Sequence, residues 1–417
     1  MKFIINREEI LAPLQQIVSV IEKRQTMPIL SNVLMVIEDD QLILTGTDLE
    51  IQIIAKINIA KDGVYAENLP GAGLAIAAAT PGSITVPARK FLDICRLLPN
   101  GAEIKFELQD DIARDGVYAG NLPGAGSAIA REGEYAASQS GTGAAKVKIT
   151  SSRSRFSLSC LPADNYPEFA ESELENHLFI NAGKFKKALD KTVFCMANQD
   201  VRYYLNGLLF NVSNSKLKLV ASDGHRLSIY EDNLDQASGI EARIILPRKG
   251  VLELSRLLDD PEAELKVEFS SNNIRIFIKN LIFSAKLVDS KYPDFGKVFQ
   301  QEFFNQIHIQ KQILKEALTR VAILSNEKFK GVTFDITPES MKISTHNPEH
   351  DEAEEELAIE YIGEPLSIAF NAQYLLDAVS NLDSELAVLT IASNASSCFI
   401  DEPGECGYKF IVMPMRL

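Results

Sequence analysis

Asp223 and His225 are the side chains of this sequence whose types and spacing most suggest acid–base chemistry. A carboxylate close to an imidazole can support a general base. No nucleophile motif of the GxSxG kind accompanies the pair. Two glycine-rich NLPGAG segments, at 68–73 and 121–126, lack the Lys-Ser/Thr that follows the last glycine of a phosphate-binding loop. The sequence therefore favours a protein that is not an enzyme.

The cysteines indicate neither a metal site nor a disulfide framework. Their number is odd, none has the close CxxC spacing of a metal or redox site, and no cluster joins them to histidines. We expect reduced thiols in a cytoplasmic protein, with no metal and no cofactor. No run of about 18 apolar residues is present, so no membrane span is expected. The strand-like, acid-containing start at 1–9 does not resemble a signal peptide.

The net charge is −15, which by itself argues against a nucleic-acid partner. The cations nevertheless gather on segments that we expect to be helices, at 7–23, 181–197 and 310–325 and after residues 87 and 247. Most such charges are solvated helix faces. If all of these helices line one surface, however, that surface is basic and can bind phosphates without reading base sequence. The cations are Arg7, Lys23, Arg24, Arg89, Lys90, Arg96, Lys184, Lys186, Lys187, Lys191, Arg248, Lys249, Arg256, Lys311, Lys315 and Arg320.

Internal repetition is the strongest architectural feature of the chain. The segment 87–98 returns as 247–258 and, more faintly, as 371–382. A strand pattern that ends in a turn, at 155–169, returns at 282–295. Such repetition predicts three copies of one α+β domain, each with two helices packed on one face of antiparallel sheet. We place the copies at 1–176, 177–303 and 304–417.

Copy one is longer than the others because it carries two insertions, near 62–78 and 112–145. The sixteen-residue segments 62–77 and 115–130 within them differ at only two positions, although the three copies themselves have diverged much further. Gly, Ala and Ser dominate, without helical or strand periodicity, so we expect exposed loops that the host domain tolerates. Their similarity suggests recent acquisition or engineering. A new partner-binding loop is the alternative interpretation.

The charges of copy one and copy three have opposite signs. Copy three carries the acidic run 349–356, and copy one carries Arg89, Lys90, Arg96, Arg153 and Arg155. A contact between copy one of one chain and copy three of another would match these signs. Head-to-tail interfaces of this kind close into rings when the rotation permits. A merely solvated acidic loop is the alternative.

Seven motifs carry a resemblance that covers the chain outside the two insertions. They are TGTDLE at 45–50, VPARKF at 86–91, QDVRYYLNG at 199–207, SDGHRL at 222–227, SNNIR at 271–275, ILSNEKF at 323–329 and VMPMRL at 412–417. With these motifs the chain resembles the bacterial DNA polymerase III β sliding clamps. The resemblance implies a head-to-tail homodimer, a ring of six similar domains with helices inside, around duplex DNA.

The resemblance also implies a function. A clamp tethers the replicative polymerase to DNA and confers processivity without catalysing a reaction or holding a cofactor. Its implied partners are double-stranded DNA without sequence preference, the replicative polymerase, the clamp loader and other proteins with clamp-binding motifs, and no membrane. The alternative is a clamp-like monomer whose insertions prevent ring closure, which would act as a peptide-motif binding module.

Three sets of site residues follow from the resemblance by matching position. The DNA contacts would be Arg24, Gln199, Tyr203, Tyr204, Arg248 and Lys249. The partner-motif groove would be lined by Tyr204, Leu205, Gly224, Arg226, Leu227, Pro293, Val298, Met413, Pro414, Met415 and Arg416. The dimer interface would use Arg89, Lys90, Phe156, Leu158, Ile323, Leu324, Glu352 and Glu355. The chain departs from the family at Lys297 and Ser222, where Arg and Thr are frequent.

Overall fold

The fold was analysed in a computed structural model. The described residues are 1–22, 27–59, 79–109, 145–169, 174–234, 239–296, 303–392 and 397–416. Nearly all of both insertions lies outside these ranges, as do Arg24 and Val298. The chain divides into two compact units, Met1–Ala170 with Asn280–Ile282, and Glu171–Lys279 with Phe283–Leu417.

Each copy repeats one order of elements: a strand, a helix, four strands, a second helix and three strands. Copy one contains β1 (Lys2–Asn6), α1 (Arg7–Val20), β2 (Asn32–Glu38), β3 (Gln41–Thr47), β4 (Ile51–Asn58), β5 (Gly82–Pro87), α2 (Ala88–Leu97), β6 (Glu103–Gln109), β7 (Lys146–Ser151) and β8 (Ser154–Ser159). Copy two contains β9 (Asn176–Asn181), α3 (Ala182–Thr192), β10 (Gly207–Asn214), β11 (Lys216–Ser222), β12 (Arg226–Asn233), β13 (Ile240–Pro247), α4 (Arg248–Leu257), β14 (Glu264–Phe269), β15 (Asn273–Ile278) and β16 (Leu281–Lys286). Copy three contains β17 (Phe303–Gln310), α5 (Lys311–Val321), β18 (Gly331–Ile336), β19 (Ser340–His346), β20 (Glu352–Ala358), β21 (Leu366–Asn371), α6 (Ala372–Ser380), β22 (Leu386–Ala392), β23 (Cys398–Asp401) and β24 (Tyr408–Val412).

The strand orders repeat as faithfully as the elements. In copy one the orders are β5-β2-β3-β4 and β1-β6-β7-β8, and the corresponding strands of copies two and three follow the same two orders. The described pairings are antiparallel. The prediction of three tandem α+β copies with antiparallel sheets is therefore confirmed.

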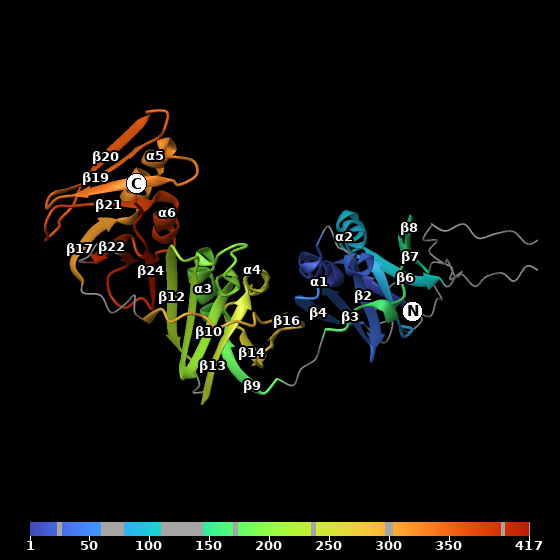
Figure 1. The fold of residues 1–417 in the computed structure, drawn as a ribbon. Coiled ribbons are helices and arrows are strands. Elements are labelled where there is room, and N and C mark those ends of the chain that lie inside the picture. The colour runs from blue at the N-terminus through green and yellow to red at the C-terminus, as the bar shows by residue number, and fades with distance from the viewer. Residues whose placement is uncertain are drawn as a thin grey trace, which may run out of the picture. The chain divides into compact units, whose positions relative to one another are not determined.

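The helices of each copy lie on one face of the sheet that its second to fifth strands form (Figure 1). α1 packs on β3 and β4, α3 on β11 and β12, and α5 on β19 and β20. A Cβ atom at Gly46 of β3 would lie 2.5 Å from the Ile17 side chain, so glycine here allows α1 to approach the sheet closely. The strands alternate as the period of two requires, and β15 buries Ile274, Ile276 and Ile278.

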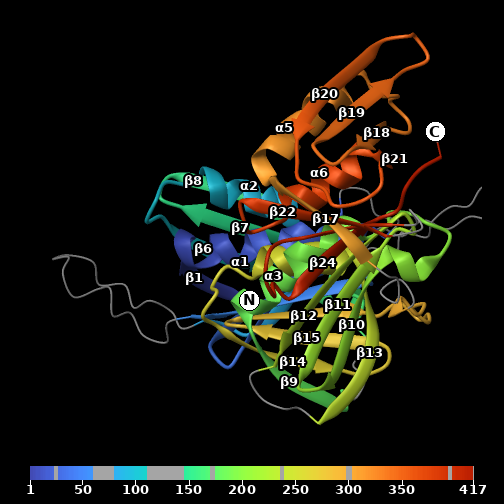
Figure 2. The same ribbon diagram turned by 90° about the vertical axis from the view of Figure 1, so that its left-hand side faces the viewer.

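Copies two and three share one sheet. β12 pairs with β24, and Leu227 lies opposite Ile411 and Ile229 opposite Lys409. The strand order across the junction is β13-β10-β11-β12-β24-β23-β22-β17. Figure 2 labels β12 and β24, the two strands that meet at the junction. A ladder of backbone hydrogen bonds thus holds β24, the last strand of copy three, against β12 of copy two.

β8 and β20 are edge strands, each at one end of a four-stranded sheet. Among the described residues, β8 pairs only with β7 in the ladder, and β20 only with β19. Phe156, which the resemblance places at the dimer interface, lies on β8. The first insertion falls between β4 and β5, and the second between the paired strands β6 and β7. No helix among the described residues is long and apolar enough to cross a membrane.

Candidate functional sites

The Asp223 carboxylate builds the turn between β11 and β12. Its Oδ1 accepts hydrogen bonds from the backbone N–H groups of His225 (2.9 Å) and Arg226 (3.0 Å), and Ser222 Oγ donates to the carbonyl of Arg226 (2.7 Å). Asp48 Oδ1 accepts from two backbone N–H groups in the equivalent turn of copy one. The carboxylate that suggested acid–base chemistry is therefore occupied by a repeated turn motif.

Arg226 connects that turn to α6. Its Nε donates to Asp223 Oδ2 at 3.0 Å, its NH1 donates to Asp377 Oδ2 at 2.5 Å, and its guanidinium lies 4.3 Å from the centre of the Tyr374 ring. The side chain is largely buried. Sequence reasoning placed Arg226 in the groove but missed Asp377 and Tyr374, because nothing local relates residues 150 positions apart.

The C-terminal segment lies beside the same turn. The backbone N–H of Met413 donates to the carbonyl of His225 at 2.9 Å, and that of Met415 donates to the carbonyl of Ala369 at 2.7 Å. Met413 is 41% exposed, although most large apolar side chains of this region are buried. The structure thus brings the predicted groove residues 413–416 next to the predicted groove residues of the 222–227 turn.

An apolar cluster lies beside this segment. Its partly buried members include Tyr204, whose ring meets that of Tyr292 edge to face with 6.1 Å between centres. Of the predicted groove residues, Leu227 also belongs to the cluster, Leu205 is buried, and Pro293 is exposed. The buried members are Leu209, Val220, Leu227, Ile245, Tyr292, Phe399 and Ile411, and the partly buried ones are Tyr204, Ile229, Val288 and Phe295.

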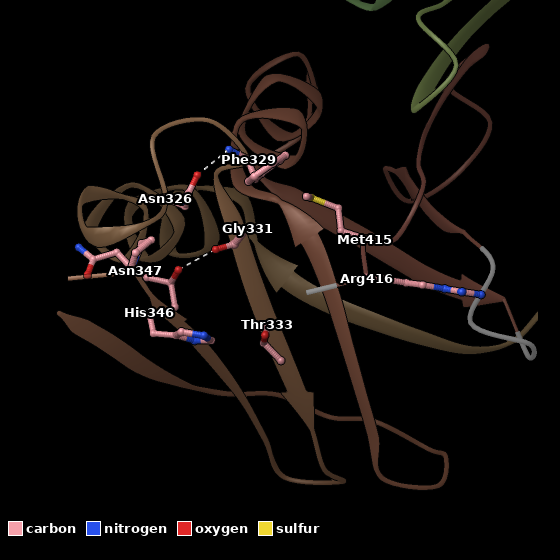
Figure 3. A pocket seen from close by; sticks show the side chains of 10 residues that line it. Asn326, Phe329, Gly331, Thr333, His346, Asn347, Met415 and Arg416 are labelled. Carbon is pink, nitrogen blue, oxygen red and sulfur yellow. Dashed lines mark hydrogen bonds between the residues drawn. The ribbon is translucent and has the colours of Figure 1, made fainter. Parts of the chain in front are cut away.

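A cavity of about 410 Å³ adjoins the end of the chain (Figure 3). Phe329 and Met415 lie on the same side of it, and the Arg416 side chain extends away from the other labelled residues. Sequence reasoning included Met415 and Arg416 but missed the rest of the lining. The lining residues are Asn326, Phe329, Gly331, Thr333, Thr345, His346, Asn347, Pro348, Met415 and Arg416.

The predicted DNA contacts of copy two lie in and around the segment 198–206. Gln199 is exposed with a left-handed backbone (φ 59°), and Tyr203 is 74% exposed. The neighbouring Tyr204 instead packs on the apolar cluster. The two adjacent tyrosines therefore differ in what they offer to a ligand, and Arg24 lies outside the described residues.

In copies one and two, an arginine at the start of the second helix donates a hydrogen bond to a carbonyl group just after the first helix. Arg248 NH1 donates to the carbonyl of Met196 at 2.8 Å, and Arg89 NH2 donates to the carbonyl of Ile21 at 2.8 Å. Both acceptors follow the C-terminal end of the first helix of their copy, where carbonyl groups lack intrahelical partners. Copy three has Ala372 at this position. These hydrogen bonds explain why the arginine recurs, and its predicted contacts with DNA or a partner chain stay predictions.

The predicted subunit edges are β8, β20 and the turn after α5. Phe156 and Leu158 are two residues apart on β8, so they lie on the same face of the strand and alternate with exposed serines. Ile323 is 75% exposed. Glu355 on β20 accepts a hydrogen bond from Arg320 Nε of the same chain at 2.9 Å, and this contact holds the pKa of its carboxyl below the ordinary value. Glu352, at the start of β20, is exposed.

Sequence models of one family match all three copies. The N-terminal domain of the DNA polymerase III beta subunit matches residues 1–121, its central domain matches 179–294, and its C-terminal domain matches 296–416. The chain belongs to the DNA polymerase III beta subunit family.

Named relatives agree with this assignment over the whole length of the chain. The beta sliding clamps of Salmonella typhimurium and Pseudomonas putida are 39% and 37% identical over 417 residues, with 100% of both chains covered. The crystal structure of the DNA polymerase III subunit beta from Pseudomonas aeruginosa has a TM-score of 0.85 at 36% identity, again with 100% of both chains covered. The likeness therefore extends across all three copies.

Proposed function

We propose that the chain is a sliding clamp, a homodimeric ring of six domains that encircles duplex DNA and tethers the replicative polymerase and other motif-bearing proteins. The observation that carries this proposal is the threefold recurrence of one element order and one pair of strand orders. The names of its relatives support this function rather than the monomeric alternative. The protein is then a non-catalytic subunit of a DNA polymerase holoenzyme that acts in the cytoplasm.

The edge strands β8 and β20 supply a head-to-tail interface. β8 carries Arg155, Phe156 and Leu158, and β20 carries Glu352 and Glu355. An edge strand exposes unpaired backbone groups that another edge strand can satisfy. Joining β8 of one chain to β20 of the next would extend both sheets, with opposite charges at the rim and with Ile323 and Leu324 against Phe156 and Leu158. Two such contacts close a ring.

The DNA contact is electrostatic. Lys249, the second residue of α4, supplies positive charge, and the neutral Gln199 and Tyr203 are exposed on the 198–206 segment, where they can donate hydrogen bonds to phosphates. Phosphate contacts of this kind position DNA without specifying sequence, which is what sliding requires. The resemblance to the family adds Arg24 and Arg248 to this surface. Because Arg248 NH1 donates to the carbonyl of Met196, only the remaining N–H groups of that guanidinium can contact DNA.

The partner-motif groove is proposed between the 222–227 turn and the C-terminal segment. The apolar cluster with Tyr204 and Leu227 forms its base, and Met413 offers an adaptable apolar side chain. The domain boundaries 1–176, 177–303 and 304–417 are part of the same proposal.

Two measurements test the proposal. Light scattering after size exclusion at micromolar concentration should give a mass near twice 46.1 kDa. After loading by a clamp loader, the protein should stay on nicked circular DNA during gel filtration and leave when the circle is cut. A mass near 46.1 kDa, with no retention on the circle, would establish the monomeric alternative instead.

A further inference from the structure

A second cavity, of about 570 Å³, lies on the same sheet as the proposed groove. None of the residues that line it belongs to the three sets of predicted site residues. It is bounded by β11, β12, β24, the segment before residue 297 and the turn between β23 and β24. Its lining residues are Lys218, Ile229, Glu231, Phe295, Gly296, Gly404, Glu405, Cys406, Gly407, Tyr408 and Lys409.

The cavity continues the apolar cluster at the base of the groove. Ile229 and Phe295 line the cavity and also pack against that cluster. Leu227 and Ile229 are two positions apart on β12, and Ile411 and Lys409 are two positions apart on β24, so each pair shares a sheet face. A strand advances by about 7 Å over two residues. A chain seated over Leu227 therefore reaches the cavity within about two residues.

The rim of the cavity offers one cation with a weak intramolecular partner. Lys218 Nζ lies 2.7 Å from Glu231, whose carboxylate also meets Lys216 at 3.0 Å. Lys409 Nζ instead lies 3.9 Å from Asp401, and its side chain is 57% exposed. A carboxylate brought over the cavity would meet Lys409 beside an apolar floor.

We propose that this cavity receives the residues of a partner protein that directly follow or precede its groove-bound motif, with one apolar side chain on Ile229 and Phe295 and one carboxylate at Lys409. The inference rests on the proposed function of the groove. The cavity then distinguishes partners that share a motif but differ in the residues beside it. Continuity with the groove and the charge of Lys409 favour this occupant over an unrelated ligand.

Cys406 makes the cavity directly observable. It is the one cysteine of the chain that is not buried, and it lines the cavity. Two synthetic peptides from the clamp-binding segment of a replicative polymerase serve as probes, one restricted to the motif and one carrying four further natural residues on each side. We measure their dissociation constants with the full-length protein, and the rate at which a maleimide modifies Cys406 with each peptide bound.

We expect both peptides to bind, and only the long one to slow the modification of Cys406. Lys409→Glu should weaken the long peptide about fivefold and leave the short one unchanged, as for one half-exposed ion pair. Lys342→Glu is the matched control, because Lys342 also lies in a strand, is half-exposed and has its carboxylate partner at 3.8 Å. Equal affinities with unprotected Cys406 would overturn the inference and leave the groove standing. If neither peptide binds, the groove and its extension are both wrong.

Discussion

Lys191 of α3 and Asp383, which follows α6, form an ion pair with 2.5 Å between Nζ and Oδ1. Lys191 is only 6% exposed; it also donates to the carbonyl of Asn381, and its Nζ lies 4.3 Å from the centre of the Tyr408 ring. Lys187 meets the same carboxylate at 2.9 Å. Two lysines that the charge pattern assigned to a basic helix face therefore hold copy two to copy three.

Substitutions of Asp383 and of Lys191 should lower the free energy of unfolding by different amounts. Asp383→Asn leaves the buried Lys191 ammonium without its counter-charge; because the Asp383 side chain is half-exposed and partly screened by water, this should lower the free energy of unfolding by about 2–3 kcal/mol. Lys191→Met removes the buried charge and should cost about 1–2 kcal/mol through the lost hydrogen bonds. Urea unfolding measures both, with the half-exposed Lys187→Met as the control. A larger cost for Lys191→Met would contradict the assignment of the pair as a buried one.

The same pair predicts a pH dependence. Burial by itself would raise the pKa of Asp383, but the hydrogen bonds from Lys191 and Lys187 outweigh it and the pKa is lowered. A lowered pKa contributes stability above the unfolded value of about 3.9 that is lost as the pH falls through the folded value. The difference in unfolding free energy between the native protein and Asp383→Asn should thus be constant above about pH 5 and shrink below about pH 4. A difference that is as large at about pH 3 as at about pH 6 would show that Asp383 does not titrate in this way.

Substitutions of Arg248 and Lys249, adjacent cations at the start of α4, should have different effects: the first on stability and the second on DNA binding. Arg248→Ala removes the hydrogen bond to the carbonyl of Met196 and should cost about 1–2 kcal/mol of unfolding free energy. Lys249→Ala should weaken DNA retention, with a salt slope smaller by about 1. Thermal unfolding and DNA binding at several salt concentrations provide the two readouts. An Arg248→Ala variant as stable as the native protein would contradict the capping role of Arg248.

Thiol titration should find one reactive cysteine in the native chain. Burial raises the pKa of Cys160 to about 11 and that of Cys95 and Cys398 to about 12, and it also raises the pKa of Cys195. At pH 8 these thiols stay protonated as well as shielded, and the thiolate is the nucleophile. A disulfide reagent at pH 8 should therefore modify Cys406 within minutes, and all five cysteines only in denaturant. More than one fast thiol would show that a buried cysteine opens to solvent.

The exposed Ile323 should contribute to the affinity of the two subunits for each other. Ile323→Asp places a charge where apolar contact with Phe156 and Leu158 is proposed, and should weaken the dimer at least about 100-fold, as for a desolvated interface residue. Val201→Asp is the control, because Val201 is equally apolar, is 88% exposed and lies in copy two. Light scattering over a dilution series gives the dimer dissociation constants. A dimer that survives Ile323→Asp would place the interface elsewhere.

Several features of the fold could be predicted because their signals are local or repeated. The return of 87–98 at 247–258 and of 155–169 at 282–295 was enough to predict three α+β copies. The greater length of copy one, compared with the other two copies, located both insertions within it. The C-terminal segment was also assigned to the groove region, where its backbone meets His225.

The roles of individual cations could not be predicted in this way. Charge patterning treated Lys191, Arg248 and Arg89 alike, as members of a basic surface. Lys191 pairs with Asp383, and the two arginines donate hydrogen bonds to carbonyl groups after helix ends. Only the folded chain brings these partners within hydrogen-bond distance. Arg226 likewise depends on Asp377 and Tyr374, far away along the chain.

The sequence by itself thus determined the order of elements, the number of copies and the family, because periodicity and repeated motifs are written along the chain. Only the tertiary structure decided the pairing of β12 with β24, the cavity beside Lys409 and which lysines are buried in ion pairs. Sheet register, burial and electrostatic partners depend on distances between residues far apart in sequence, and these distances exist only in the folded molecule.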